Sequence, residues 1–311
     1  MMKYQKILAV IDPEDEEQKS LMRAIEIAQI TQAQITAFLP IYDLSYEMTT
    51  MLSTDERENM RFAVIEDKSA WLAELVAPIE KQHGIKIDLN VEWHNRAWES
   101  IICRVMKHNY DLIVKGTQLN DTLKAVIFTP TDWHIMRKSP VPVLLVKDHD
   151  WPIGGKVLGA VSVGVEDDDH VALNDCVTRS AKGFAGLLSS EVHLVNAYPG
   201  TPVNIAIEIP EFDPQVYSDS VKDHHHNAML RHAQKHEIPQ NCSHIEEGLP
   251  EDVIPALAEK IDAELVVLGT VGRQGISGVL IGNTAEHVID KLNCDVLAIK
   301  PDGYVSPVVC S

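Results

Sequence analysis

The sequence predicts an α/β protein with two similar domains, each a parallel sheet covered by helices on both faces. Two observations support this fold class. Short apolar runs alternate with amphipathic stretches along the 311 residues, as expected of buried parallel strands joined by helices. Residues 111–147 and 264–300 also align without a gap at a constant offset of 153, so that Lys147 falls on Lys300. A repeat of this length indicates a duplicated unit.

The first half is expected to contain five strands separated by helices. Its first apolar run, residues 7–11, is short and continuous, which is typical of a strand buried on both faces. Leu21, Ile25 and Ala28 then recur at helical spacing. The other strands are expected at 34–39, 85–91, 112–114 and 143–146, and the other helices at 43–82, 98–108 and 132–138.

The second half repeats this order. Pro250 is expected at the first position of a helix, where its missing N–H costs nothing. Residues 199–214 are rich in proline and apolar residues and are expected to form a long loop. With a linker at 151–155, we predict domains of 1–150 and 151–311. Strands are expected at 157–163, 192–196, 243–247, 265–268 and 296–299, and helices at 172–188, at about 216–236, and from residue 250.

The charge balance argues against polyanionic partners. The chain has 27 Lys and Arg against 46 Asp and Glu, a net charge of −19, so nucleic acid and anionic membrane surfaces are repelled. No apolar stretch approaches the roughly 18 residues that span a bilayer, so no membrane insertion is expected. The five cysteines are scattered, without a Cys-x-x-Cys pair, which favours a reducing cytoplasm.

A glycine-rich loop follows the fourth strand of the second half. Gly269 ends that strand, Gly272 follows, and Gly282 precedes Asn283 and Thr284 at the start of a helix. Glycines let a backbone approach a phosphate, and the free N–H groups of a helix start bind anions. The loop therefore indicates either a nucleotide site or a glycine-rich turn with an ordinary helix cap. The lysine of a Walker loop is absent, which excludes a P-loop NTPase.

The loop resembles the Gly-x2-Gly-x9-Gly-Ser/Thr motif of ATP-binding universal stress proteins, and the duplicated layout resembles their tandem form. Gly269, Gly272 and Gly282 match the motif, whereas Asn283 stands where Ser or Thr is expected and Thr284 offers a hydroxyl one position later. The resemblance implies two Rossmann-like domains, related to adenine nucleotide α-hydrolase folds, with five parallel strands each. It also implies a role in stress resistance, with ATP or a related nucleotide as the ligand.

The resemblance further implies an aspartate near the adenosine, at the end of the first strand. Asp12 matches it in the first half, while Ser162, followed by Val163, occupies the equivalent place in the second half. In the first half Thr129 and Pro130 stand where the second half has its last motif glycine and Asn283, and Pro130 removes an N–H that a phosphate would need. We therefore expect the nucleotide in the second domain. The predicted binding residues are Gly269, Thr270, Gly272, Gly282, Asn283, Thr284, Ser162 and Val163.

Six of the 14 histidines lie within residues 224–244. His225, His232 and His236 share one face of the expected helix, and His232-x3-His236 is a workable pair of zinc ligands, with Asp223 or His225 as a third. The alternative is a solvated polar face without an ion. Because His-Glu-x-x-His is absent, a zinc ion here would be structural or adventitious.

Two apolar stretches follow the second strand of each half, at residues 41–62 and 198–217. They form either core and packing between the halves or a groove for an amphiphilic metabolite, for example a lipid-like or nucleotide-linked one. Methionines in the first stretch suit an adaptable apolar wall.

No motif for catalysis occurs, so we expect a cytoplasmic stress-response protein that binds a small molecule without a dedicated catalytic site. A slow ATP-hydrolysing enzyme is the alternative. Because the chain is already duplicated, it is expected to be a monomer with an internal pseudo-dimer or a homodimer.

Overall fold

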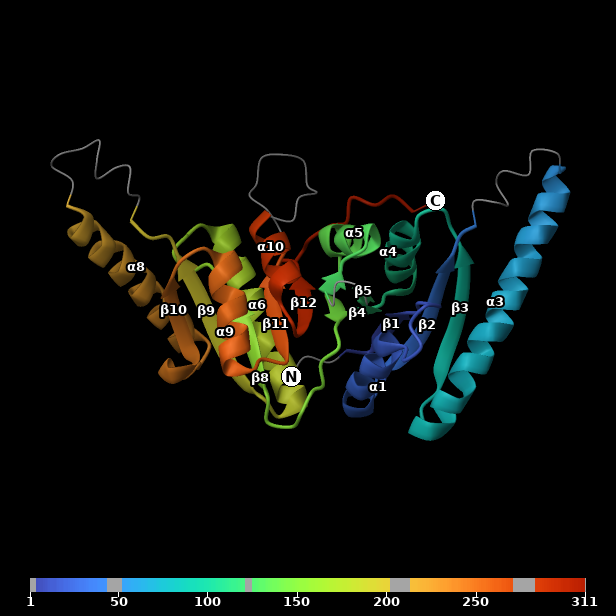
Figure 1. Ribbon diagram of the computed structural model, residues 1–311, viewed down its shortest axis with the longest axis horizontal. Helices are drawn as coiled ribbons and strands as arrows, with labels where there is room; N and C mark the ends of the chain where they lie inside the picture. The colour runs from blue at the N-terminus through green and yellow to red at the C-terminus, as the bar shows by residue number, and fades with distance from the viewer. Residues whose placement is uncertain (1–3, 44–51, 121–124, 202–212, 271–282, 311) are drawn as a thin grey trace. The chain divides into compact units, whose positions relative to one another are not determined.

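The computed structural model describes residues 4–43, 52–120, 125–201, 213–270 and 283–310 (Figure 1). They divide into two compact units. The N-terminal unit comprises residues up to Lys147 together with the C-terminal stretch from Val305, and the C-terminal unit comprises Asp148–Tyr304. Each unit is considered by itself below.

The N-terminal unit contains a five-stranded parallel sheet in the order β3-β2-β1-β4-β7. A short antiparallel pair follows β4. The strands are β1 (Lys6–Val10), β2 (Gln34–Ile41), β3 (Ile87–Trp93), β4 (Leu112–Gly116), β7 (Val143–Val146) and the pair β5 (Gln118–Asn120) and β6 (Ala125–Ile127). The helices are α1 (Lys19–Thr31), α3 (Thr54–His83), α4 (Ala97–His108) and α5 (Pro130–Lys138).

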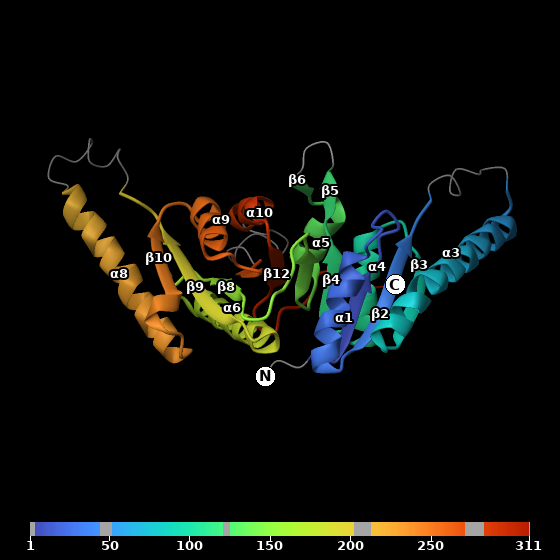
Figure 2. The same cartoon turned by 60° about the horizontal axis from the view of Figure 1, so that its bottom comes forward.

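The C-terminal unit repeats this parallel sheet in the order β10-β9-β8-β11-β12. In Figure 2, α9 and α10 lie side by side on one face, and α6 packs on β8 and β11 from the other. The strands are β8 (Lys156–Ala160), β9 (Glu191–Tyr198), β10 (Ser243–Glu247), β11 (Leu265–Gly269) and β12 (Asp295–Ile299). The helices are α6 (Asp168–Leu188), α8 (Pro214–Lys235), α9 (Pro250–Ile261), α10 (Asn283–Lys291) and the short 3₁₀ helix η1 (Gln240–Cys242).

The predicted fold class is confirmed, and the strand order locates the ligand edge. In each unit the first strand in the chain lies between the second and the fourth. The chain therefore moves outward in opposite directions from the pairs β1–β4 and β8–β11. Open α/β sheets bind ligands beyond the carboxyl ends of the strands at such a point of reversal.

Apolar strands form the core of each unit. Ile7, Leu8 and Ala9 of β1 are fully buried, and so are Leu265 and Val266 of β11. Burial on both faces of the sheet explains why these strands are continuous apolar runs rather than alternating ones.

Helix boundaries follow from their caps. The sequence predicts one helical stretch over 43–82, whereas α3 begins at Thr54 because Ser53 and Glu56 form a reciprocal capping box. Likewise α8 begins at Pro214, with the Asp213 carboxylate accepting hydrogen bonds from two backbone N–H groups of the first turn.

One disulfide joins Cys103 of α4 to Cys310 of the C-terminal stretch, both within the N-terminal unit. The scattered positions of the cysteines favoured reduced thiols instead. Spacing could not indicate this pair, because 207 positions separate the two residues. No helix in the described part of the chain is long and apolar enough to cross a membrane.

Candidate functional site

Four of the predicted nucleotide residues, Ser162, Val163, Gly269 and Thr270, lie at or just beyond the carboxyl ends of β8 and β11 in the C-terminal unit. Ala160 of β8 pairs with Leu268 of β11, so the segments that leave these two strands start side by side. One segment carries Ser162 and Val163, and the other starts with Gly269 and Thr270. Residues more than 100 positions apart in the sequence thus flank the point where the strand order reverses.

Two asparagines hold the segment after β8. The Ser162 N–H donates to Asn174 Oδ1 at 2.9 Å, and Asn174 Nδ2 donates back to the Ser162 carbonyl at 3.0 Å. The Val163 N–H donates to Asn196 Oδ1 at 3.0 Å. Asn174 and Asn196 are buried, on α6 and β9 respectively. Asn196 follows the apolar pair Leu194 and Val195 in β9, which is a weak sequence signal, whereas Asn174 lies among other polar residues of α6 and has none.

His225 packs against this same segment rather than beside His232 and His236. Asn196 Nδ2 donates to His225 Nδ1 at 3.0 Å, and the His225 ring stacks on Tyr198. Gly164 leaves room for the imidazole, because a Cβ there would lie 2.0 Å from His225 Cε1. Burial, and then the charge of His224, lowers the pKa of His225. A neutral imidazole therefore lies over the loop after β8.

A cavity of about 550 Å³ opens between this loop and α8. That volume lies within the range of roughly 300–1,000 Å³ typical of small-molecule sites. Its wall combines apolar, amide and cationic side chains: Val163, Val165, Glu166, Val171, Asn174, Ala228, Arg231, His232 and Lys235.

The side chain of Lys300 is hydrogen-bonded to Thr270. Lys300 Nζ donates to the Thr270 carbonyl at 3.0 Å and to its hydroxyl at 2.5 Å, and the Thr270 hydroxyl donates to the Ile299 carbonyl at 3.2 Å. Burial lowers the pKa of Lys300 to about 7. Near neutral pH, only part of the molecules therefore carry a protonated Lys300 amine, and a nearby phosphate would favour the protonated form.

The structure describes the two ends of the glycine loop but not residues 271–282 between them. Gly272 and Gly282 lie outside the described residues, and the side chains of Asn283 and Thr284 are not described. Helix α10 does begin at Asn283, where the sequence predicts a helix start. All of the predicted nucleotide-binding residues therefore stay a prediction.

At the equivalent helix start in the N-terminal unit, a side-chain carboxylate lies at the backbone N–H groups. Thr129 and Asp132 form a capping box on α5, in which the Thr129 N–H donates to Asp132 Oδ2 at 2.6 Å. Asp132 Oδ1 lies 2.7 Å from Lys115 Nζ, and the Asp132 side chain is fully buried. At the offset of 153, these two positions hold Leu268 and Ala285 in the second half. A side-chain carboxylate thus takes the place that a phosphate would need at this helix N-terminus.

Asp12 follows β1 in the N-terminal unit, as predicted. Its Oδ1 accepts the Glu14 N–H at 3.0 Å, and its carbonyl accepts Gln18 Nε2 at 2.7 Å. Within this unit, Asp12 is therefore part of the turn that leads into α1.

The structure brings two of the four predicted metal ligands together. His232 and His236 lie near Asp175 of α6, with His236 Nε2 2.7 Å from Asp175 Oδ1. Asp223 is exposed, and His225 is bonded to Asn196 as described. Asp175 lies far from the helix in the sequence, so spacing could not identify it. Zinc at this helix stays a prediction.

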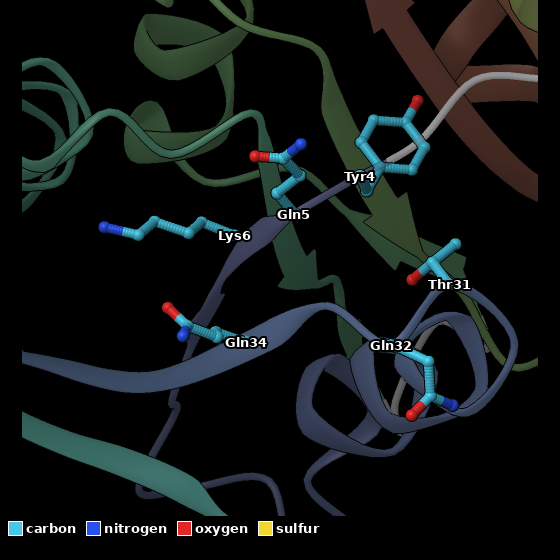
Figure 3. Close-up of a pocket in the computed structure, with 6 residues that line it drawn as sticks. All are labelled: Tyr4, Gln5, Lys6, Thr31, Gln32 and Gln34. Atoms are coloured by element: carbon cyan, nitrogen blue, oxygen red, sulfur yellow. The ribbon is translucent and has the colours of Figure 1, made fainter.

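A second hollow lies at the opposite edge of the N-terminal sheet. Figure 3 shows six side chains around a space of about 470 Å³ where β1 and β2 begin. This is the amino edge of the strands, away from the ligand edge of such sheets. The lining residues are Tyr4, Gln5, Lys6, Thr31, Gln32 and Gln34.

Known proteins resemble the whole chain. The model of the universal stress protein family matches residues 3–147 and 161–300. Universal stress protein E of Escherichia coli K12 is 52% identical over 309 residues, which cover 99% of this chain and 98% of that protein. A functionally unknown protein from Pseudomonas aeruginosa PAO1 has a solved structure that is 31% identical with a TM-score of 0.75, covering 96% of this chain and 93% of its own. A putative universal stress protein from Pseudomonas aeruginosa UCBPP-PA14 is 32% identical with a TM-score of 0.73, covering 96% and 94%.

Proposed function

Because the chain belongs to the universal stress protein family and carries its domain in both halves, we propose that it binds ATP or a related nucleotide in the C-terminal unit. The ligand lies at the carboxyl edge of the sheet, between the ends of β8 and β11. Binding rather than turnover is the role, in a stress response in the cytoplasm.

One observation carries this proposal. Ala160 pairs with Leu268 at the reversal point of the sheet, so the chain continues from neighbouring strand ends toward Ser162 and Val163 on one side and Gly269 and Thr270 on the other. Helix α10 follows β11 and begins at the predicted motif position, Asn283. Parallel strands ending at a reversal point, followed by a helix start, are the arrangement that binds nucleotide phosphates in open α/β folds.

The site residues divide into two groups by chemistry. Gly269, Gly272 and Gly282 let the backbone approach the phosphates, and the N–H groups at Asn283 and Thr284 donate to them. Ser162 and Val163 lie on the adenosine side. Lys300, whose charge varies near neutral pH, supplies positive charge behind the phosphate loop.

Isothermal titration with ATP tests the proposal. Gly272→Val and Gly282→Val place a branched side chain where the backbone must approach a phosphate. Loss of one hydrogen bond to a charged group costs about 1.5–3 kcal/mol, so the affinity falls by at least about tenfold. Leu119→Val and Thr129→Val change the equivalent positions of the other copy and are expected to leave ATP binding intact. Equal affinity in all five proteins would overturn the proposal.

A second candidate ligand is an amphiphilic metabolite on the N-terminal unit. Part of the apolar stretch at 41–62 lies outside the described residues, but Tyr42, Met60 and Phe62 are exposed, Phe62 by 63%. These three side chains therefore do not belong to a closed core. Native mass spectrometry of freshly purified protein would detect such a ligand by its added mass, and Phe62→Ser would release it.

A further inference from the structure

We propose that Glu191, His193 and Cys242 form a zinc site at the outer edge of the C-terminal sheet. The site lies where β9 begins and where η1 passes into β10, the edge strand of this unit (Figures 1 and 2). It is separate from the nucleotide edge, because ligands of such sheets bind at the opposite, carboxyl ends of the strands. Zinc binding is measured without nucleotide, so it stands or falls independently of the proposed function.

Two short patterns on neighbouring strands build the site. Glu191-Val-His193 begins β9, and Cys242, the last residue of η1, directly precedes β10, which carries His244. Residues two apart in a strand point to the same face. The parallel register pairs Ser243 with Leu194, which brings Cys242 beside His193.

The donor atoms of His193 and Cys242 both lie close to the Glu191 carboxylate. His193 Nε2 lies 3.1 Å from Glu191 Oε2, and Cys242 Sγ lies 3.3 Å from Glu191 Oε1. One donor atom from each of the three residues lies within 4.8 Å of the others. Metal–ligand bonds of about 2.0–2.3 Å in a tetrahedron place neighbouring donors roughly 3.3–3.7 Å apart. The two separations from Glu191 are therefore within a few tenths of an ångström of those in a zinc site.

Burial and orientation distinguish this cluster from a surface group of polar residues. The Cys242 side chain is fully buried and His193 is 7% exposed, whereas Glu191 is exposed and leaves a route for the ion. His244 Nε2 lies 2.9 Å from His193 Nδ1, and the two rings stack. Metal-bound histidines are typically oriented by such a partner on the other ring nitrogen. His244 is therefore a positioning residue.

Zinc binding at this site releases one proton, that of the Cys242 thiol. Without metal, His193 Nε2–H donates to Glu191, and His193 Nδ1 accepts the Nε2–H of His244. Zinc displaces the Cys242 thiol proton, which leaves to solvent. The His193 proton moves through solvent from Nε2 to Nδ1 and is donated to His244 Nε2, while the His244 proton moves from Nε2 to Nδ1, so that each ring keeps one proton. No oxidant or reductant is involved.

The donor set favours zinc. One thiolate, one imidazole and one carboxylate, with water in the fourth position, match the ligands that zinc takes. The other candidate group, Asp175 with His232 and His236, has no thiolate. Its carboxylate also holds the Lys235 ammonium at 2.6 Å, which an ion would have to displace. We therefore assign the tighter binding to the Cys242 cluster.

The test uses the full chain with its Cys103–Cys310 disulfide intact, freed of metal by a chelator. Zinc is titrated by calorimetry, and cobalt replaces zinc for spectroscopy, because a cobalt–thiolate bond produces a charge-transfer absorption that nitrogen and oxygen ligands do not. Cys242→Ser is compared with Cys176→Ser, which also changes a buried cysteine but one bonded to Arg179. The wild type and Cys176→Ser are expected to bind one tight zinc and show the absorption, and Cys242→Ser to lose both.

Two further variants keep the test decisive. Glu191→Gln changes an exposed side chain, so the protein folds whether or not Cys242→Ser does, and zinc affinity is expected to fall. His244→Gln is expected to weaken zinc about 10–100-fold, as for other residues that orient a ligand. Zinc binding that survives Glu191→Gln and Cys242→Ser but disappears in His232→Gln would place the ion at the helix histidines and overturn the proposal, as would a cobalt complex without thiolate absorption.

Discussion

Replacing Asp132 with alanine tests why the first copy of the repeat differs from the second. Asp132 is fully buried and pairs with Lys115 at 2.7 Å; the Lys115 side chain is 10% exposed. The contact is a charge pair rather than a well-aligned hydrogen bond. Asp132→Ala would leave the Lys115 ammonium buried without this partner and would also remove the capping box of α5.

The magnitude follows from the distance. At 2.7 Å and an effective dielectric constant of about 20, the attraction between the two charges is about 6 kcal/mol, most of which offsets their desolvation. Removing one partner of a buried pair typically costs about 3–5 kcal/mol. Replacing both partners with apolar residues is neutral or stabilising, so Lys115→Leu combined with Asp132→Ala, the residues of the second copy, is expected to recover most of the loss.

Urea unfolding measures both effects. With a slope of about 2 kcal/mol per molar urea, the single variant lowers the midpoint of the N-terminal unit by about 1.5–2.5 M. The double variant returns close to the wild-type midpoint. The reasoning is wrong if the single variant shifts the midpoint by less than about 0.5 M, or if the double variant is less stable than the single one.

Two other predictions concern the C-terminal unit. Burial lowers the pKa of Lys300 from 10.5 to about 7, so between these pH values the unfolded chain binds a proton that the folded chain does not. The free energy of unfolding of the wild type therefore rises with pH over that window. Lys300→Met should lack this rise when thermal unfolding is followed against pH, and a pH profile equal to that of the wild type would contradict the burial of the amine. Gly164→Ala puts a methyl group 2.0 Å from His225 Cε1, and it is expected to lower the free energy of unfolding, measured in urea, by roughly 1–3 kcal/mol. Adding His225→Ala should remove the clash and restore stability. A double variant as unstable as Gly164→Ala would show that the two residues are not in close contact.

The sequence predicted the features that are local or periodic. Apolar runs indicated the strands, and the offset between Lys147 and Lys300 indicated the duplication, because buried parallel strands and repeated units leave regular patterns. The helix start at Asn283 was predicted for the same reason: a cap and a glycine are local signals.

Contacts between distant segments could not be predicted in this way. The Cys103–Cys310 disulfide, the approach of Asp175 to the helix histidines and the juxtaposition of His193 with Cys242 all depend on how strands and helices pack. Spacing along α8 suggested that His225 faces the same partner as His232. In the structure Asn196 bonds to His225 and Gly164 leaves room for its ring, because the helix spans both the loop after β8 and the face of α6.

Hydrogen exchange with and without ATP tests the central claim most directly, since it locates the ligand as well as detecting it. The amides of residues 161–165 and 283–286 are expected to exchange more slowly with ATP, while the equivalent residues of the first copy, 11–15 and 130–133, are unchanged. Protection confined to the first copy, or no protection in either copy at saturating ATP, would contradict a nucleotide site at the ends of β8 and β11.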